Sequence, residues 1–381
     1  SPPAESEDGR APTRPDAARD LPPADRLAVD LPRDAPVPDG DPADGPLTDG
    51  RVEASLPDAP PPDAGSFTGV TCWSAPPPGA TLAAKPPAAS GGSCPTLKTG
   101  TNTLTSKGAK RTFILVLPGK PKPSETFPVL FLWHWLKGSA KSFLTKGEVQ
   151  KAADQQRFIA IIPESKNDLS LYGLITLPWP FTTLDSKARI AEELTFFDDM
   201  LSCVSQQYSV NKECVSSVGV SAGALFTALL ASARSDVLAS FVSLSGGAGG
   251  SPGVNAVLRP WTSTKRRLPA LVLWGGPQDS CILLNFQAAS QDLEQALTKD
   301  GHFVVECIHN CKHGEPPLIT PQGKSRYASI WEFAFAHPFW LPKGRSPMEG
   351  GLPKGYIPWC GVGQGSAKPR TGSCPPPGCP F

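Results

Sequence analysis

A serine lies between two glycines in the sequence GVSAG, residues 219–223. This G-x-S-x-G motif separates a short apolar segment, 215–220, from a segment with helical spacing, 222–233. The glycines permit a tight strand-to-helix turn that strains the serine and exposes its hydroxyl, and the helix N-terminus points unpaired N–H groups at developing negative charge. The motif therefore predicts Ser221 as a nucleophile. The competing interpretation is a glycine-rich connection without chemistry.

A serine hydroxyl attacks well only when a histidine removes its proton and an acid holds that histidine in the right tautomer. Asp279 lies five residues after the apolar segment 270–274, and His313 follows the apolar segment 303–308. Glycine and proline in both loops are typical of loops that hold functional side chains outside the core. We therefore predict Asp279 as the acid and His313 as the base.

Each of these two residues has a competitor. Asp279 could cap the N-terminus of a following helix, although Asn285 is better placed to do so, and Asp236 is the alternative acid. His309 is the alternative base, four residues before His313. We favour His313 because it lies farther into the loop that follows the last apolar segment.

The anion formed in such a reaction needs two N–H donors. The backbone of Ala222, directly after the nucleophile, is the expected first donor. The second is expected in the loop after an early strand, at Trp135 or Leu136. His134, at the start of this loop, is interpreted as a structural residue.

Short apolar segments alternate with segments of helical spacing, including apolar steps of four and three residues between 190 and 204. Continuous apolar segments of this length are typical of strands buried on both faces of a mainly parallel sheet. The alternation predicts a three-layer α/β fold that binds ligands at the carboxyl ends of its strands. The predicted strands are 113–117, 129–134, 158–162, 215–220, 241–244, 270–274 and 303–308, and further helices are 222–233, 286–297 and 327–336.

The composition divides the 381-residue chain into four parts. The first part, residues 1–65, contains 15 Pro, 15 acidic residues, six Arg and no aromatic residue, which gives a net charge of −9. It cannot bury enough apolar surface to fold and is expected to be a disordered tether. The other parts are a lead-in at 66–109 closed by a Cys72–Cys94 disulfide, a catalytic domain at 110–341, and a Cys-, Pro- and Gly-rich extension at 342–381.

The ten cysteines all lie outside the predicted tether, and their even number favours disulfides and an oxidising, extracytoplasmic compartment, either secreted or in the cell envelope. No apolar segment reaches the ~18 residues of a transmembrane helix. The positive charges are scattered, which excludes a nucleic-acid partner. The acidic, proline-rich tether is similar to the linkers of bacterial lipoproteins, so a lipid anchor N-terminal to the given chain is an alternative to free secretion.

From about Lys110 to Trp340, the sequence resembles the α/β-hydrolase superfamily, and within it the secreted polyhydroxybutyrate depolymerases, feruloyl esterases and acetylxylan esterases. The resemblance rests on VLFLWH (129–134), VGVSAGA (218–224), the loop of Asp279 and CKHGEPP (311–317). It implies a catalytic triad of Ser221, Asp279 and His313.

The loop after the early strand departs from this family, which usually has glycine where this chain has Trp135. A large aromatic side chain is therefore expected at the mouth of the site. The resemblance also implies that the apolar insertion 171–181 forms a wall or lid. There Trp179 either joins Trp135 in a substrate-binding platform or packs beneath its own loop.

The resemblance also implies a Cys203–Cys214 disulfide. A Cys281–Cys311 disulfide would join the acid and base loops, and the competing arrangement joins the base loop to the C-terminal extension. Connectivity does not follow from sequence. The cysteines of the competing arrangement are Cys307 and Cys311 on one side and Cys360, Cys374 and Cys379 on the other.

The leading functional hypothesis is a secreted serine esterase that uses an acyl-enzyme mechanism and needs no metal or organic cofactor. Its ester substrate would be a polyester such as polyhydroxybutyrate, or a feruloyl or acetyl ester of polysaccharide. The alternative is a non-catalytic hydrolase-fold binding protein of the cell envelope. Zinc is disfavoured because the spacing of its candidate ligands does not match the usual paired motifs. Those candidates are Cys307, His309, Cys311 and His313.

Overall fold

The structure is a computed structural model that describes residues 67–318, 320, 322–376 and 379. These residues belong to one compact unit, residues 63–381. The predicted tether, residues 1–65, lies outside the described residues. Within the described part of the chain, no helix is both long enough and apolar enough to cross a lipid bilayer.

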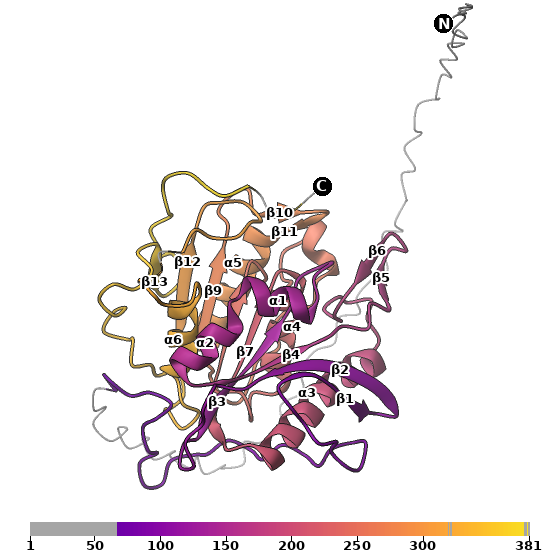
Figure 1. Ribbon diagram of the computed structural model, residues 1–381. Helices are drawn as coiled ribbons and strands as arrows, with labels where there is room; N and C mark the ends of the chain where they lie inside the picture. The colour runs from indigo at the N-terminus through magenta and orange to yellow at the C-terminus, as the bar shows by residue number, and fades with distance from the viewer. Residues whose placement is uncertain (1–66, 319, 321, 377–378, 380–381) are drawn as a thin grey trace, which may run out of the picture. The chain divides into compact units, whose positions relative to one another are not determined.

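A mainly parallel sheet forms the centre of this unit, and nine of the strands in its described residues belong to it (Figure 1). The six central strands run parallel, and antiparallel strands close both edges. In spatial order they are β1 (Gly100–Ser106), β2 (Ala109–Val116), β4 (Ile159–Pro163), β3 (Phe127–Trp133), β7 (Val210–Val220), β8 (Ser240–Leu244), β9 (Ala270–Trp274), β12 (Val304–Ile308) and β13 (Cys360–Val362).

Helices cover both faces of the sheet, which gives the predicted three layers (Figure 1). One face packs against α3 (Lys187–Gln207), α4 (Ala222–Ala233) and α5 (Phe286–Lys299). The other packs against α1 (Ala140–Lys146), α2 (Val149–Gln156) and α6 (Ala328–Phe335). Two hairpins, β5–β6 (Leu169–Leu171, Ile175–Leu177) and β10–β11 (Ser280–Cys281, Leu284–Asn285), and a short 3-10 helix (Val254–Val257) lie in the connections.

Every predicted strand and helix corresponds to an observed one, but the sheet extends beyond the predicted domain limits. Strand β1 begins at Gly100, inside the predicted lead-in, and pairs with β2. Strand β13 comes from the C-terminal extension and pairs with β12. Helices α1 and α2 were not predicted, because they have only seven and eight residues and contain few apolar residues.

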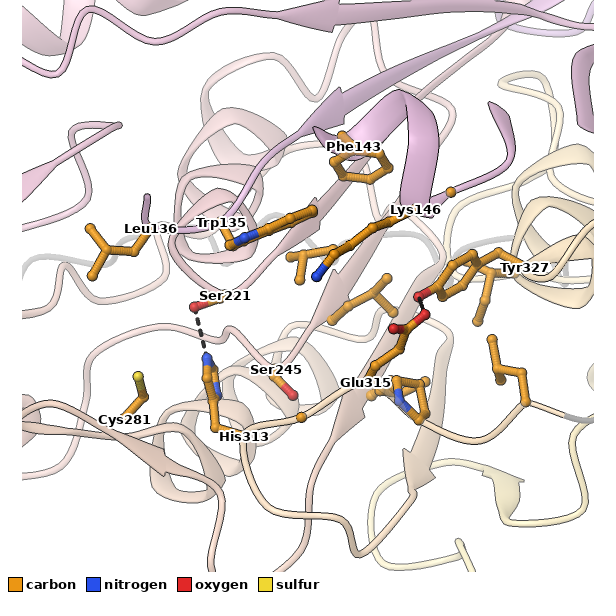
Figure 2. A pocket seen from close by; sticks show the side chains of 18 of the residues that line it. Trp135, Leu136, Phe143, Lys146, Ser221, Ser245, Cys281, His313, Glu315 and Tyr327 are labelled. Carbon is orange, nitrogen blue, oxygen red and sulfur yellow. Dashed lines mark hydrogen bonds between the residues drawn. The ribbon is translucent and has the colours of Figure 1, made fainter. Parts of the chain in front are cut away.

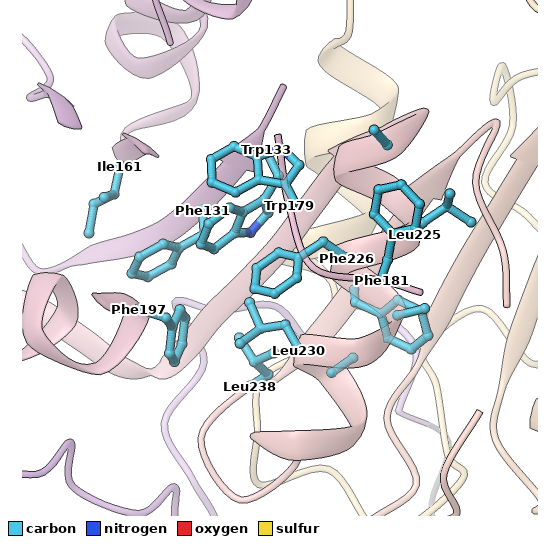
Figure 3. Packing of buried hydrophobic residues seen from close by; sticks show 14 of the residues in the cluster. Phe131, Trp133, Ile161, Trp179, Phe181, Phe197, Leu225, Phe226, Leu230 and Leu238 are labelled. Atoms are coloured by element: carbon cyan, nitrogen blue, oxygen red, sulfur yellow. The ribbon is translucent and has the colours of Figure 1, made fainter. Parts of the chain in front are cut away.

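Aromatic side chains concentrate where β3, β7 and α4 meet (Figure 3). The ring of Trp133 lies 5.1 Å from that of Trp179 and 4.8 Å from that of Phe226. All three are fully buried, and burial of such a side chain contributes roughly 1.5–3 kcal/mol. This cluster packs beneath the end of β3 and the start of α4. The loop after β3 and the turn between β7 and α4 therefore rest on rigidly packed side chains.

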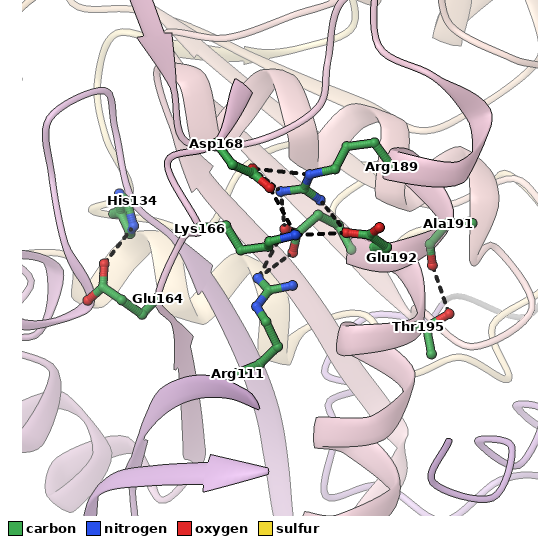
Figure 4. Close-up of polar contacts among 10 residues, drawn as sticks. Arg111, His134, Glu164, Lys166, Asp168, Arg189, Ala191, Glu192 and Thr195 are labelled. Atoms are coloured by element: carbon green, nitrogen blue, oxygen red, sulfur yellow. Dashed lines mark hydrogen bonds and ion pairs between the residues drawn. The ribbon is translucent and has the colours of Figure 1, made fainter. Parts of the chain in front are cut away.

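A buried ion-pair network joins β2 to α3 (Figure 4). Glu193 has no exposed surface and accepts hydrogen bonds from Arg111 at 2.9 Å and Arg189 at 2.8 Å. Asp168, directly before the β5–β6 hairpin, pairs with Arg189 and Lys166. This network links β2, α3 and the segment before the β5–β6 hairpin, and removal of either arginine would leave Glu193 with fewer partners for its buried charge.

All ten cysteines form disulfides, as their even number favoured, but several predicted pairings are wrong. The lead-in is tied to the main fold and is not closed on itself, which rules out Cys72–Cys94 and Cys203–Cys214. A Cys281–Cys311 disulfide is also absent, and the competing arrangement with the C-terminal extension is correct. The observed disulfides are Cys72–Cys214, Cys94–Cys203, Cys281–Cys379, Cys307–Cys360 and Cys311–Cys374.

Candidate active site

Ser221 sits on a sharp turn between β7 and α4. Its backbone has φ 54° and ψ −119°, a conformation that costs a residue with a side chain roughly 1–3 kcal/mol. A Cβ atom at Gly219 would collide with the backbone of Gly223, and one at Gly223 would collide with the carbonyl of Trp133. The two glycines of the motif are therefore required by close backbone approach. The N–H of Ser221 also donates to the Leu244 carbonyl at 2.8 Å, which ties the turn to β8.

The three residues predicted as a triad lie in one hydrogen-bonded row. His313 Nε2 is 2.8 Å from Ser221 Oγ (Figure 2), and His313 Nδ1 is 2.7 Å from Asp279 Oδ1. The serine and the histidine are each 8% exposed, whereas the aspartate has no exposed surface. In this geometry the Nδ1–H donates to the carboxylate and Nε2 is free to accept the serine proton.

Hydrogen bonds join the loop that contains Asp279 (the acid loop) to the loop that contains His313 (the base loop). The N–H of Gly275 donates to the second carboxylate oxygen of Asp279 at 2.6 Å. The N–H of Lys312 donates to the Gly275 carbonyl at 2.9 Å. A further contact was not predicted, in which the ring of Phe286 stacks on that of His313 at 4.1 Å. An aromatic residue directly after the helix cap Asn285 was the available signal.

The competing residues lie elsewhere. His309 is fully buried, its Nδ1 accepts from the Cys311 N–H at 3.3 Å, and burial lowers its pKa to about 4. Asp236 is exposed and follows the C-terminal end of α4, opposite to the end that carries Ser221. Asn285 caps α5, as predicted, by accepting from the Ala288 N–H.

The zinc alternative is wrong, because two of its four candidate ligands are in disulfides. Cys307 is bonded to Cys360 and Cys311 to Cys374. A third candidate, His313, is engaged by the row of hydrogen bonds described above. Among the described residues, no cluster of His, Cys, Asp and Glu side chains has the arrangement of a metal site.

The loop after β3 reaches the N-terminus of α4. Gly223 packs so closely that an added Cβ would also meet the carbonyl of His134. The Nδ1–H of His134 donates to the Trp135 carbonyl at 3.0 Å, and the N–H of Gly138 donates to the same carbonyl at 2.9 Å. His134 is fully buried, and its Nε2 lies 3.4 Å from Glu164 (Figure 4), so it is structural, as the sequence analysis expected.

A cavity of about 270 Å³ opens beside Ser221 and His313 (Figure 2). Its walls are mostly apolar and aromatic and come from the loop after β3, α1, the segment after His313 and α6. The polar side chains on it include Lys146, whose ammonium lies 5.0 Å above the Trp135 ring, and Glu315, which accepts from Tyr327 at 2.8 Å. Walls of this kind suit a compact apolar group, because an apolar cavity of 150 Å³ already accommodates benzene.

Trp179 does not fit the predicted role of a platform residue. It has no exposed surface, and its indole N–H donates to the His134 carbonyl at 2.8 Å. It packs beneath its own loop and supports the loop after β3 from below, which was the alternative interpretation. Trp135, in contrast, lines the cavity as predicted, together with Leu136.

Comparisons with known proteins agree with this architecture. No family model matches the chain. Feruloyl esterase D of Neurospora crassa is 26% identical over 169 residues, which cover 43% of this chain and 56% of that protein. The chain thus spans about half the length of this curated relative.

Two solved structures have a similar fold. A complex of a pOPH variant with DMSO has a TM-score of 0.58 and 18% identity over 74% of this chain and 97% of that one. Native sOPH has a TM-score of 0.54 and 18% identity over 72% and 99%. The predicted resemblance to the α/β-hydrolase esterases is confirmed, and the chain has their fold.

Proposed function

We propose that this protein is a serine esterase that hydrolyses carboxylic esters through an acyl-enzyme. The observation that carries this proposal is the unbroken row from Ser221 Oγ through the His313 ring to Asp279, next to an apolar cavity. His313 Nε2 takes the serine proton as Oγ attacks the ester carbonyl, and then returns it to the departing alcohol. Water, activated by the same imidazole, releases the acid and restores the serine.

The oxyanion of each tetrahedral intermediate is assigned to two backbone N–H groups. Ala222 supplies the first, since it is the first residue of α4, where N–H groups have no intrahelical partner. The second comes from Trp135 or Leu136, in the loop that packs against the start of α4. The large Trp135 side chain lines the cavity and is compatible with this role, because the donor is a backbone group.

The substrate class follows from the cavity and the relatives. A cavity of about 270 Å³ with aromatic walls favours a short or aromatic acyl group, and a polymer would enter with one unit at a time. Similarity to a feruloyl esterase supports ester hydrolysis. We assign the protein to an extracytoplasmic location, secreted or anchored to the envelope, because five disulfides are typical of proteins in oxidising compartments.

A fluorophosphonate probe and a panel of esters test the proposal. We expect the wild type to be labelled at Ser221 and to hydrolyse p-nitrophenyl acetate, with feruloyl esters and polyhydroxybutyrate film separating the substrate classes. Ser221→Ala should abolish labelling and lower kcat by about 10⁶-fold, to the residual rate supplied by the rest of the site. The matched control is Ser232→Ala, at the far end of the same helix, which should leave both unchanged.

The same experiment distinguishes the proposed esterase from the alternative, a non-catalytic binding protein. Absence of labelling together with absence of Ser221-dependent turnover on every ester would favour it. A strained nucleophile argues against it, since a conformation that costs free energy is retained where it serves a function.

A further inference from the structure

The loop that carries His313 has a backbone that side chains disfavour. Asn310 and Lys312 have φ values of 57° and 59°, in the left-handed region where glycine is the usual residue. Cys311 lies between them and is 3% exposed. Such conformations persist only where the surrounding structure holds them in place.

The C-terminal extension supplies much of that hold. Cys311 forms its disulfide with Cys374 of the extension. The N–H of Arg370, four residues earlier, donates to the carbonyl of Ile308 at 2.9 Å, at the point where β12 ends and the loop begins. The extension is therefore bonded to the base loop at two points, one at its start and one at its middle.

The same extension also holds the acid loop. Cys281, two residues after Asp279, is bonded to Cys379 and lines the cavity. The hydrogen bond from the Lys312 N–H to the Gly275 carbonyl then connects the two loops directly. The acid and the base are thus attached to one segment that follows the α/β core in the sequence.

We propose that the Cys311–Cys374 disulfide is a positioning element of the active site. It fixes the strained backbone around Cys311, so that the imidazole of His313 stays within hydrogen-bond distance of Ser221. This inference rests on the proposed esterase function. Its consequence is that the folded chain reaches full activity only when its C-terminal extension is oxidised.

The effect is expected in kcat and not in KM. The cavity walls come from the loop after β3, from α1, from α6 and from the segment after His313, and neither Cys311 nor Cys374 lines the cavity. Proton transfer, in contrast, depends on the 2.8 Å contact between His313 and Ser221. A misplacement of about 1 Å in such a contact costs roughly 100-fold in rate.

Paired substitutions test the proposal in the full chain. Cys311→Ala with Cys374→Ala opens the positioning disulfide, and Cys307→Ala with Cys360→Ala opens a matched control. Both disulfides join the β12 region to the extension, and their residues are 63 and 53 apart in sequence, so the entropic costs of losing them are nearly equal. The control lies within the sheet, where Cys307 pairs with Cys360 across β12 and β13.

We expect the first pair to lower kcat for p-nitrophenyl acetate by at least about ten-fold, with KM within about two-fold of the wild type. The control should lose a comparable amount of thermal stability and keep kcat within about two-fold. Wild-type kcat in a folded Cys311/Cys374 variant, an equal loss in the control, or a loss confined to KM would overturn the inference. If the wild type shows no Ser221-dependent turnover, the proposed function fails instead.

Two further measurements apply if a variant folds poorly or if activity is absent. Hydrogen exchange of residues 309–314 should accelerate in the first pair and not in the control, and equal exchange in both would contradict the proposal. In the wild type, dithiothreitol should reduce Cys311–Cys374 before Cys307–Cys360, because Cys374 is exposed and Cys307 is fully buried. Each opened disulfide yields two thiols as the dithiol becomes its cyclic disulfide. Turnover should fall as Cys311–Cys374 opens and return on reoxidation.

Discussion

Two buried carboxyl groups lie near helix α5, and their surroundings differ completely. Asp279 precedes the helix, and its carboxylate accepts hydrogen bonds from His313 at 2.7 Å and from the Gly275 N–H at 2.6 Å. Glu294 lies within the helix, and neither of its carboxyl oxygens has a hydrogen-bond partner among the residues that the structure describes. Both side chains belong to residues with no exposed surface.

The two carboxyl groups differ in the hydrogen-bond donors and charges that surround them. Burial, together with charge repulsion from the nearby carboxyl of Glu306, raises the pKa of Glu294 to about 9. Glu294 is therefore protonated at neutral pH. The donors around Asp279 are those that stabilise a carboxylate and, through it, a positively charged imidazole. Helix α5 thus adjoins one buried carboxyl group that is surrounded by hydrogen-bond donors and one that is not.

The largest expected effect comes from a substitution of Asp279. Asp279→Asn keeps the shape, but its amide would donate to Nδ1 of His313 and force the proton onto Nε2, where it blocks acceptance from Ser221. We expect kcat to fall by about 10⁴-fold with little change in thermal stability. Steady-state kinetics and the rate of fluorophosphonate labelling measure this effect.

Asp236→Asn is the control for this substitution. Asp236 was the alternative acid, and it is exposed at the other end of α4. The activity of Asp236→Asn should equal that of the wild type. A fall in kcat for Asp236→Asn as large as that for Asp279→Asn would contradict the assignment of the acid.

The residues placed by a strand and the loop or turn directly after it were predictable from sequence. The motif around Ser221 lies between a strand and a helix that both have clear apolar patterns, so its turn follows from local chemistry. Asp279 and His313 follow from the rule that functional loops lie at the carboxyl ends of parallel strands. These side chains therefore meet without any long-range information beyond the order of the strands.

Features that depend on where distant segments return were not predictable. Strand β13 pairs with β12 across more than fifty residues, and this return decides which cysteines meet. Glu294 lies beside the apolar positions Leu293 and Leu297, and nothing in its spacing distinguishes it from a surface residue of an amphipathic helix. Trp179 was ambiguous for the same reason, since its burial depends on the packing of β3 and α4 beneath it.

A substitution at Glu294 tests its buried protonated state through the dependence of stability on pH. The native carboxyl keeps its proton up to about pH 9, whereas the unfolded chain releases it near 4.5. The native state therefore binds more protons between these values, and its stability falls as pH rises, by up to about 1.4 kcal/mol per pH unit. Glu294→Gln removes this titration, so its stability relative to the wild type should rise by as much as roughly 4 kcal/mol from pH 5 to pH 8.

Urea unfolding at several pH values measures this difference. Glu306→Gln is the informative companion, because it leaves Glu294 buried but removes its charged neighbour, and so should lower the pKa of Glu294. In Glu306→Gln, the loss of stability with rising pH should therefore end at a lower pH than it does in the wild type. Parallel stability curves for the wild type and Glu294→Gln would show that this carboxyl does not titrate in the folded protein as described.

The smallest expected effect concerns the residue that separates the two carboxyl groups along α5. Phe286 begins the helix, its N–H donates to the Asp279 carbonyl at 2.8 Å, and its ring stacks on His313 at 4.1 Å. Phe286→Leu keeps the backbone bond and the apolar volume but removes the stacked face. Aromatic contacts of this kind contribute about 0.5–1.5 kcal/mol, so kcat should fall by roughly 2- to 10-fold at unchanged KM. Phe303→Leu, at the edge of β12 and away from the triad, is the control for loss of a buried ring. If Phe286→Leu loses stability but no turnover, the ring only packs, and the orientation of His313 depends on Asp279 and the disulfide of its loop.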